Sequence, residues 1–264
     1  MSYAALVIFA KAPIAGQVKT RLCPPLTPDE AASLHGSFVL DALEHSKTAI
    51  AKHRLPLDRY LACAPSARHV FFQILGERHG VKLLDQVGED LGSRMTHAFS
   101  TMFSSGYENA LLVGTDIPSL PLNTYRDALA LLGDHDLVLG PSRDGGYYLI
   151  GLKRPVPELF ADIPWSTDRV LDLTRQKAER LGLKTGLLTV QRDIDTIDDL
   201  FALVNEAGIE REARGARLEA KNKKVDFPLS SRTAGALRLI ADRLRTRMPQ
   251  SHGEPGARST RNQP

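Results

Sequence analysis

The sequence has little cysteine and no long hydrophobic segment, and both absences narrow the possible kinds of protein. Its 264 residues include only two cysteines, Cys23 and Cys63, which lack the C-x-x-C spacing of a zinc or redox site. We therefore expect two unpaired thiols. No apolar run approaches the roughly 20 residues that cross a bilayer, and the first residues lack the long apolar region of a signal peptide. The sequence thus predicts a cytoplasmic protein without a membrane span.

Two familiar phosphate-binding signatures are missing as well. A Walker loop has glycine immediately before Lys-Ser/Thr, whereas Gln17 and Val18 separate Gly16 from Lys19 in this chain. The sequence also contains no G-x-G-x-x-G segment, which is the pattern of a dinucleotide site. Any nucleotide site must therefore be built from a different loop.

The composition that is present is typical of a globular protein, with 42% hydrophobic and 25% charged residues. From Arg211 onward there are 13 basic and 5 acidic residues, whereas residues 1–210 contain 21 basic and 26 acidic residues. Clustered positive charge can attract nucleic acid or anionic lipid. We interpret this cluster as a solvated surface and expect no nucleic-acid partner. We expect one folded domain over residues 1–208, a charged linker and basic helix over 209–248, and a disordered tail over 249–264.

Apolar runs alternate with helical patterns, which is typical of βα units around a mostly parallel sheet. The predicted strands are Ala4–Phe9, Leu57–Cys63, Val81–Asp85, Ala110–Gly114, Leu137–Gly140, Tyr147–Gly151 and Thr185–Val190. The sequence therefore predicts an α/β fold.

Helix starts are marked by capping residues. Thr27, Pro28 and Glu30 form a capping signal, which predicts a helix running toward Lys52. A second helix should follow Asp90, because apolar residues then repeat at helical spacing: Leu91, Met95, Ala98, Phe99, Met102 and Phe103. We expect these side chains to face the core. Further helices are expected after Thr196 and over residues 234–244.

The first predicted strand runs into a loop from Lys11 to Arg21 that contains a glycine and three cations. Open α/β sheets bind ligands at this edge of the sheet. Gly16 permits backbone amides to approach an anion, Lys19 supplies a mobile charge, and the planar guanidinium of Arg21 suits phosphate oxygens. The loop predicts a site for a diphosphate or triphosphate, although a surface loop with scattered basic residues has the same composition.

Acidic residues follow two other predicted strands. Asp116 comes after a hydrophobic strand, where a carboxylate can bind Mg²⁺ or Mn²⁺, but it could instead cap the following turn. Asp193 and Asp195 alternate in an extended segment, so both could face the cleft and one could complete the metal site. The alternative is that Asp195 only supports the start of the next helix.

The segment between the fifth and sixth predicted strands contains Asp144, Gly145 and Gly146, followed by Tyr147. Asp-Gly-Gly alone is typical of a hairpin turn. The carboxylate and the aromatic ring nevertheless supply hydrogen-bonding and stacking groups close to the predicted cleft, and Trp165 would extend the same wall. We therefore predict that these five residues bind an acceptor molecule.

Six ordered segments resemble a bacterial family of glycosyltransferase-A-like proteins, the radical-SAM/selenodomain-associated transferases. The segments read FAKAPIAGQVKTRL, QVGEDLGSRMTHAF, LVGTDIPSLP, LGPSRDGGYYLIGL, PWST and DIDTIDDL, within Leu6 to Leu203. The same layout is similar to guanylyltransferases that act on phospholactate or on molybdenum cofactor. The resemblance implies a Rossmann-like nucleotide-diphospho-sugar transferase fold of the GT-A type, with a mostly parallel central sheet flanked by helices.

The resemblance also implies roles for residues. It assigns Asp116 to a metal and residues 144–147 to the acceptor. It matches Lys11, Gly16, Lys19 and Arg21 to a nucleotide-binding loop, and Asp90, Gly92 and Arg94 to a family segment to which it gives no defined role. We include both groups, together with Thr20, in the predicted nucleotide site.

Three functions stay open at this point. The first is nucleotidyl transfer from a nucleoside triphosphate to a phosphorylated small molecule, in which Lys19, Arg21 and Asp116 are the catalytic residues and the two cations stabilise the departing diphosphate. The second is glycosyl transfer from a nucleotide-sugar, which the lack of a D-x-D pair at Asp116 disfavours. The third is a non-catalytic nucleotide-binding module. Base, acceptor and oligomeric state are left undetermined.

Overall fold

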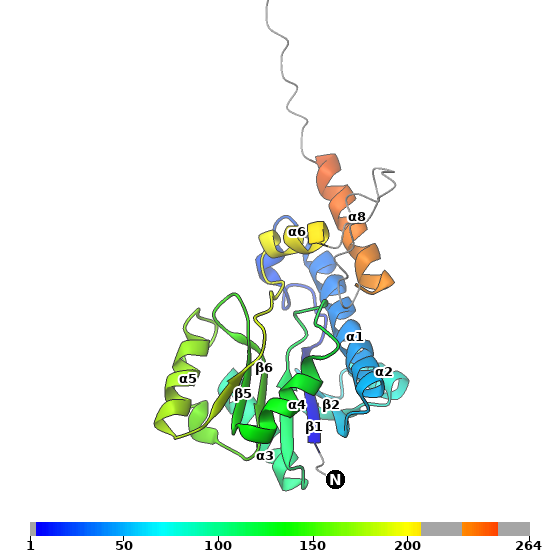
Figure 1. Ribbon diagram of the computed structural model, residues 1–264. Coiled ribbons are helices and arrows are strands. Elements are labelled where there is room, and N and C mark those ends of the chain that lie inside the picture. Colours follow the sequence, from blue (N-terminus) through cyan, green and yellow to red (C-terminus); the bar gives the residue numbers. More distant parts are fainter. Residues whose placement is uncertain (1–3, 207–228, 248–264) are drawn as a thin grey trace, which may run out of the picture.

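The computed structural model describes residues 4–206 and 229–247 (Figure 1). Its sheet has seven strands in the order β3-β2-β1-β4-β6-β5-β7. The strands are β1 (Ala4–Lys11), β2 (Leu57–Ala64), β3 (Lys82–Asp85), β4 (Asn109–Val113), β5 (Leu137–Pro141), β6 (Tyr147–Leu152) and β7 (Thr185–Leu187). Only β6 runs antiparallel to its neighbours, β4 and β5. The predicted mostly parallel sheet is confirmed, with strand ends that differ by a few residues.

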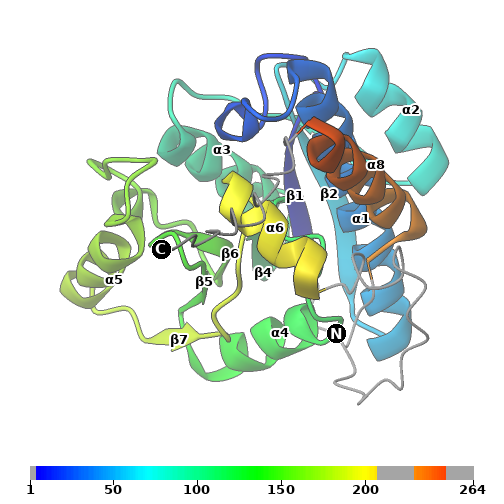
Figure 2. The ribbon, with the colours of Figure 1, turned by 90° about the horizontal axis from the view of Figure 1, so that it is seen from above.

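Helices cover both faces of the sheet (Figure 2). One face packs against α1 (Pro28–His53), α2 (Val70–His79) and α4 (Thr124–Asp134), and the other against α3 (Leu91–Ser104) and α5 (Val170–Arg180). Successive side chains of a strand point to opposite faces. Leu6 and Ile8 of β1 accordingly join the first layer, whereas Ala5 and Val7 join the second. The predicted α/β fold, with a mostly parallel central sheet flanked by helices, is confirmed.

The predicted capping residues begin their helices. In α1, the backbone amide of Glu30 donates to Oγ1 of Thr27 at 3.2 Å, and the amide of Thr27 donates back to the Glu30 carboxylate at 2.8 Å. Thr196 and Asp199 make the same reciprocal bonds at the start of α6 (Ile197–Glu206). Each pair satisfies backbone amides that have no partner within the helix.

A third hydrophobic cluster lies beyond the sheet, between the start of α1, helix α6 and helix α8 (Ser231–Arg247). Leu237 and Ile240 of α8 pack there with Leu22 and Phe38. α8 and α1 lie side by side in both ribbon views. The helix expected over 234–244 is therefore present and shares a core with the rest of the chain.

Of the predicted linker and basic helix over residues 209–248, the structure describes residues 229–247, and the predicted tail over 249–264 lies outside the described residues. The division of the chain into these segments stays a prediction. In the described part of the chain, no helix is both long and apolar enough to cross a membrane. Cys23 and Cys63 are both free thiols.

Candidate functional site

The carboxyl ends of β1, β4 and β5 lie at one edge of the sheet, beside a cleft of about 930 Å³. Loops that diverge from such an edge leave a crevice in which α/β proteins bind ligands. Residues from every predicted segment line this cleft, namely Lys11, Lys19, Thr20, Arg21, Asp90, Arg94, Asp116, Asp144, Gly146, Tyr147, Trp165, Asp193 and Asp195. The structure thus brings segments that are far apart in sequence to one place.

The side chain of Lys19 faces acidic residues and is only 5% exposed. Its ammonium lies 2.5 Å from Oδ1 of Asp116 and 2.8 Å from Oδ1 of Asp195. It also donates a hydrogen bond of 2.7 Å to the backbone oxygen of Ile194. An ammonium has three N–H donors. Two of them are donated to Asp195 and Ile194, and the ammonium also forms an ion pair with Asp116, so its charge is directed at partners within the protein.

Burial and charge act in opposite directions on this ion pair. Burial favours the neutral amine of Lys19, but the carboxylates of Asp116 and Asp195 raise its pKa above the usual value. Burial also favours the neutral acid of Asp116, yet the Lys19 ammonium lowers the pKa of that carboxyl below its usual value. Both groups are therefore charged at neutral pH, and 43% of the Asp116 side chain stays exposed to the cleft.

The segment that carries Asp193 and Asp195 is held from both sides. Between them, Ile194 is 2% exposed and packs into the third hydrophobic cluster. Its amide donates to the backbone oxygen of Asp116 at 3.0 Å, and its carbonyl accepts from Lys19. Because alternate residues of an extended segment point to the same side, both carboxylates face the cleft.

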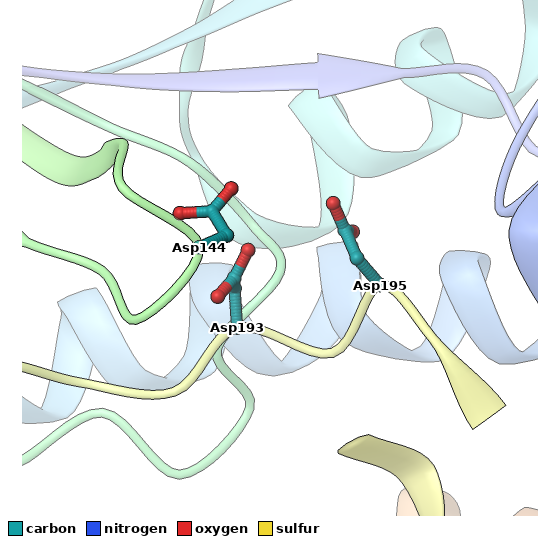
Figure 3. A group of neighbouring side chains, drawn as sticks. All are labelled: Asp144, Asp193 and Asp195. Atoms are coloured by element: carbon teal, nitrogen blue, oxygen red, sulfur yellow. The ribbon is translucent and has the colours of Figure 1, made fainter. Parts of the chain in front are cut away.

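Asp193 and Asp195 lie beside Asp144, and we call these three residues the acid group (Figure 3). One carboxylate oxygen of each lies within 4.8 Å of the others. Burial, together with the charge of Asp144, raises the pKa of Asp193 to about 7. Three acids this close repel one another when ionised, and a bound cation would remove that repulsion.

Asp144 belongs to the loop between β5 and β6, which the sequence assigned to acceptor binding. Its Oδ1 accepts hydrogen bonds from the Ser142 hydroxyl at 2.5 Å and from the Gly146 amide at 2.9 Å. Ser142 also forms a parallel bridge with Gln191, just before the other two acids. These bonds fix the Asp144 carboxylate beside Asp193, so the loop contributes to the acid group as well as to the cleft wall.

The exposed cations of the cleft are Lys11 and Arg21. Within residues 4–206 and 229–247, neither side chain takes part in a hydrogen bond or a salt bridge. Thr20 and Arg21 begin a short 3₁₀ helix, Thr20–Leu22, whose Leu22 is buried in the third cluster. This anchoring holds the exposed Arg21 beside the cleft while leaving its guanidinium available to a ligand.

Two predicted glycines support the cleft without lining it. Gly16 has a φ of +76°, a conformation that glycine adopts without strain, and no atom lies within 4 Å of where a Cβ would stand. Gly145 has a φ of +88°, and a Cβ there would overlap the backbone oxygen of Asp168. Gly145 therefore allows the loop between β5 and β6 to pack directly on the segment after Trp165.

The second predicted nucleotide segment has local structural roles at the cleft edge. Asp90 caps α3 through a 2.7 Å bond from the Ser93 amide, which, together with the Ser93 hydroxyl, lowers the pKa of Asp90. Gly92 leaves room for the Trp165 ring, because a Cβ would stand 2.8 Å from Cζ2 of that ring. Arg94 donates from Nε to the Gly88 carbonyl at 2.9 Å. Asp90 and Arg94 both line the cleft.

His35 and Leu91 are among the cleft residues to which the sequence analysis gave no role in the site. The side chain of His35, in α1, is 5% exposed. Its Nε2 lies 3.0 Å from the Lys11 backbone oxygen, and its Nδ1 is buried without a hydrogen-bond partner in the described part of the chain. Burial lowers its pKa. Its place on the buried face of the predicted helix was the only sequence signal. Leu91 was expected in the core, but this first residue of α3 is 44% exposed and lines the cleft.

The comparisons with other proteins identify the family. The profile of a family described as "Uncharacterized protein conserved in bacteria (DUF2064)" matches residues 48–167. A protein from Desulfovibrio desulfuricans G20, described as a candidate nucleotide-diphospho-sugar transferase, is 31% identical in sequence. The alignment covers 93% of this chain and 98% of that protein, with a TM-score of 0.74. The chain belongs to the DUF2064 family.

More distant structures share the fold. A CMP:2-keto-3-deoxy-manno-octonic acid synthetase bound to CTP is 12% identical, with a TM-score of 0.50 over 79% of this chain and all of the other. A cytidylyltransferase from Leptospira borgpetersenii serovar Hardjo-bovis is 13% identical, with a TM-score of 0.50 over 96% and 100% of the two chains. No curated protein is similar to this family member in sequence. The implied association with radical-SAM or selenodomain proteins stays a prediction.

Proposed function

We propose that this protein is a metal-dependent nucleotidyltransferase, which transfers a nucleoside monophosphate group from a nucleoside triphosphate to a phosphorylated small molecule. The proposal rests on one observation: the same cleft contains two cations without an ion-pair partner in the described residues, Lys11 and Arg21, and a group of converging carboxylates. Its volume of about 930 Å³ is near the upper end of the range for small-molecule sites, roughly 300–1,000 Å³, and so suits a nucleotide together with a small acceptor.

Lys11 and Arg21 are the groups that would hold the phosphates. Both are exposed at the cleft, and their charged ends have no partner in the described part of the protein. The guanidinium of Arg21 presents a planar fork that matches two phosphate oxygens, whereas Lys11 supplies a point charge. Two such groups suit the β- and γ-phosphates, which carry the negative charge that develops when they leave.

The residues of the acid group suit Mg²⁺ or Mn²⁺. Their ligand atoms are all carboxylate oxygens, which both ions prefer. Burial and the charge of Asp144 raise the pKa of Asp193 to about 7, and a cation would offset that charge. Asp193 and Asp195 would hold the ion, with Asp144 or Asp116 completing the set. When bound, the ion would neutralise charge on the phosphates.

In the proposed reaction, an oxygen of the acceptor phosphate forms a bond with the α-phosphorus. The bond from that phosphorus to the oxygen bridging the α- and β-phosphates breaks, and pyrophosphate leaves with the electron pair. Lys11 and Arg21 would stabilise the departing group, as in other phosphoryl transfers where positioning and charge supply most of the catalysis. Tyr147 and Trp165 line the same cleft and would position the acceptor.

Glycosyl transfer is the second candidate, because the Desulfovibrio relative is described as a candidate nucleotide-diphospho-sugar transferase. In that reaction the diphosphate stays on the nucleoside, and the sugar moves to the acceptor. The same cations and acids would then hold the diphosphate. The two functions therefore differ in which bond breaks, which makes the released product the deciding measurement.

The test is an incubation of the protein with Mg²⁺, each of the four nucleoside triphosphates or radiolabelled nucleotide-sugars, and a pool of phosphorylated and hydroxylated metabolites. Acceptor-dependent pyrophosphate release supports nucleotidyl transfer. Transfer of labelled sugar identifies the second candidate and rejects the first. Nucleotide binding without turnover would mean a non-catalytic module, and no nucleotide binding at all would reject the nucleotide site.

Variants test the residue roles. We expect Arg21→Ala and Asp195→Asn to lower kcat/KM at least about tenfold, because each removes a charge from the site. Arg175→Ala is the matched control, since Arg175 is exposed on α5 and does not line the cleft. Equal effects of Arg21→Ala and Arg175→Ala would contradict the assignment.

A further inference from the structure

The position of Lys19 is the feature that the proposed function leaves unexplained. The lysine belongs to the predicted phosphate loop, yet its ammonium is turned away from solvent and bound to Asp116, Asp195 and the Ile194 carbonyl. Its backbone has a φ of +48°, an uncommon conformation for a residue other than glycine. The chain thus adopts an unusual local conformation where it inserts this cation among the acids.

We propose that Lys19 is an internal counter-ion that competes with a divalent cation for Asp116 and Asp195, and that nucleotide phosphates release it. The second half of this inference rests on the proposed nucleotide site, whereas the competition itself does not. In the nucleotide-free protein, Lys19 would keep the affinity for a metal ion low.

The competition follows from shared ligands. Asp195 belongs to the acid group and also binds Lys19 through Oδ1, and the exposed part of Asp116 faces the same cleft. A divalent ion that used Asp195 and Asp116 would stand next to the ammonium, and like charges a few ångströms apart repel strongly where water is partly excluded. The ion and Lys19 therefore cannot both use these two carboxylates fully.

Release by phosphates follows from the neighbours of Lys19 in sequence. Thr20 and Arg21 line the same cleft, and the lysine side chain is a flexible stem with a compact charge. A phosphate held by Arg21 would offer the ammonium a second set of anionic acceptors. When the ammonium turns to that phosphate, Asp116 and Asp195 become free for the metal ion, so nucleotide and metal would bind cooperatively.

The first experiment measures Mn²⁺ binding to the nucleotide-free protein by electron paramagnetic resonance of the free ion. We expect Lys19→Met to bind Mn²⁺ at least about tenfold more tightly than the unmodified protein, because the competing charge is gone. Lys19→Arg keeps the charge and should bind as weakly as the unmodified protein. Lys11→Met is the matched control, since Lys11 is a cleft cation without a salt bridge to the acids, and it should change the affinity less than about threefold.

Equal or weaker Mn²⁺ binding by Lys19→Met would overturn the inference, and so would equal gains in Lys19→Met and Lys11→Met. Lys19→Met leaves two acids without their cation and could therefore fail to fold. The unmodified protein then gives an independent answer through acetylation of its lysines by N-hydroxysuccinimidyl acetate, read by peptide mass spectrometry.

In the metal-free protein, Lys19 should react far more slowly than the exposed Lys11. Saturating Mn²⁺ should raise the acetylation of Lys19 several-fold while leaving that of Lys11 within about twofold, because the ion expels the ammonium from the acids. Unchanged Lys19 acetylation at saturating Mn²⁺ would overturn the inference.

Neither readout involves nucleotide or turnover. If Mn²⁺ displaces Lys19 but no nucleotide is used, the counter-ion role stands and the proposed function fails. If turnover is found but Lys19 does not compete with Mn²⁺, only the further inference fails.

Discussion

The contact between Gly92 and Trp165 allows a sharp test of how the cleft wall is built. A Cβ at position 92 would stand 2.8 Å from the backbone oxygen of Phe160 and 2.8 Å from Cζ2 of Trp165. Distances below 3.0 Å are essentially never found for a real Cβ. Gly92→Ala must therefore push the Phe160–Trp165 segment away from α3 or tilt the start of that helix.

The magnitude follows from two opposing effects. Overpacking of a fitted contact costs about 1–3 kcal/mol. Replacing glycine by alanine within a helix gains up to about 1 kcal/mol, and less in the first turn, where Gly92 lies. We expect a net loss of about 1–2 kcal/mol in the free energy of unfolding. Gly133→Ala is the matched control, because Gly133 lies in α4 with no atom within 4 Å of its Cβ position.

Urea unfolding followed by circular dichroism measures both free energies. The fluorescence of Trp165, the only tryptophan of the sequence, reports on the cleft wall itself. Gly92→Ala should shift this emission to longer wavelength as the ring becomes more exposed, whereas Gly133→Ala should leave it unchanged and keep or increase stability. If the two variants were equally stable and their emission were the same, the packing argument would be refuted.

Two further predictions concern the free energy of unfolding, the first of them for the metal-free protein. The pKa of Asp193 is raised to about 7 in the folded protein, so the stability that its proton provides is present at acid pH and lost as pH rises through 7. Asp193→Asn should therefore stabilise the metal-free protein by about 1–2 kcal/mol at pH 8, a magnitude that is reduced because Asp193 is partly exposed. The gain should be smaller at pH 5. A gain in thermal unfolding that did not depend on pH would contradict this prediction. Thr233→Val should lower the free energy of unfolding in urea by about 1–3 kcal/mol, because the fully buried Thr233 hydroxyl donates to Asp41 at 2.5 Å. Thr167→Val is the control, and it should cost less because Thr167 is exposed.

Much of the fold could be predicted because local chemistry and tertiary structure agree. The reciprocal caps at Thr27 and Thr196 are present as hydrogen bonds, and the apolar runs form the strands. Helix α5 was not located, because its buried positions are Val170, Thr174 and Ala178, and a threonine and an alanine give a weak apolar pattern. Helix α2 begins at Val70 and is capped by a ring nitrogen of His69, which is not a usual capping residue.

The candidate site was only partly predictable. The spacing of Asp193 and Asp195 indicated that both could face the cleft, which is where the structure has them, while their binding of metal stays a prediction. The partners of Lys19 could not be predicted, because Asp195 lies 176 residues away in the sequence. A basic residue in a loop is equally compatible with a phosphate and with a carboxylate of the same protein. Only the folded arrangement distinguishes these partners.

Asp144 shows why the predicted acceptor site and the predicted metal site should not be treated as separate in this protein. The sequence places it in a hairpin-like loop, and the acceptor assignment followed from that loop alone. The bridge between Ser142 and Gln191 joins this loop to the segment of Asp193, so the carboxylate of Asp144 lies in the acid group. An acceptor phosphate bound along this loop would approach any ion held there. The charge of the acceptor and the occupancy of the acid group must then be coupled, which favours a phosphorylated acceptor over a neutral one.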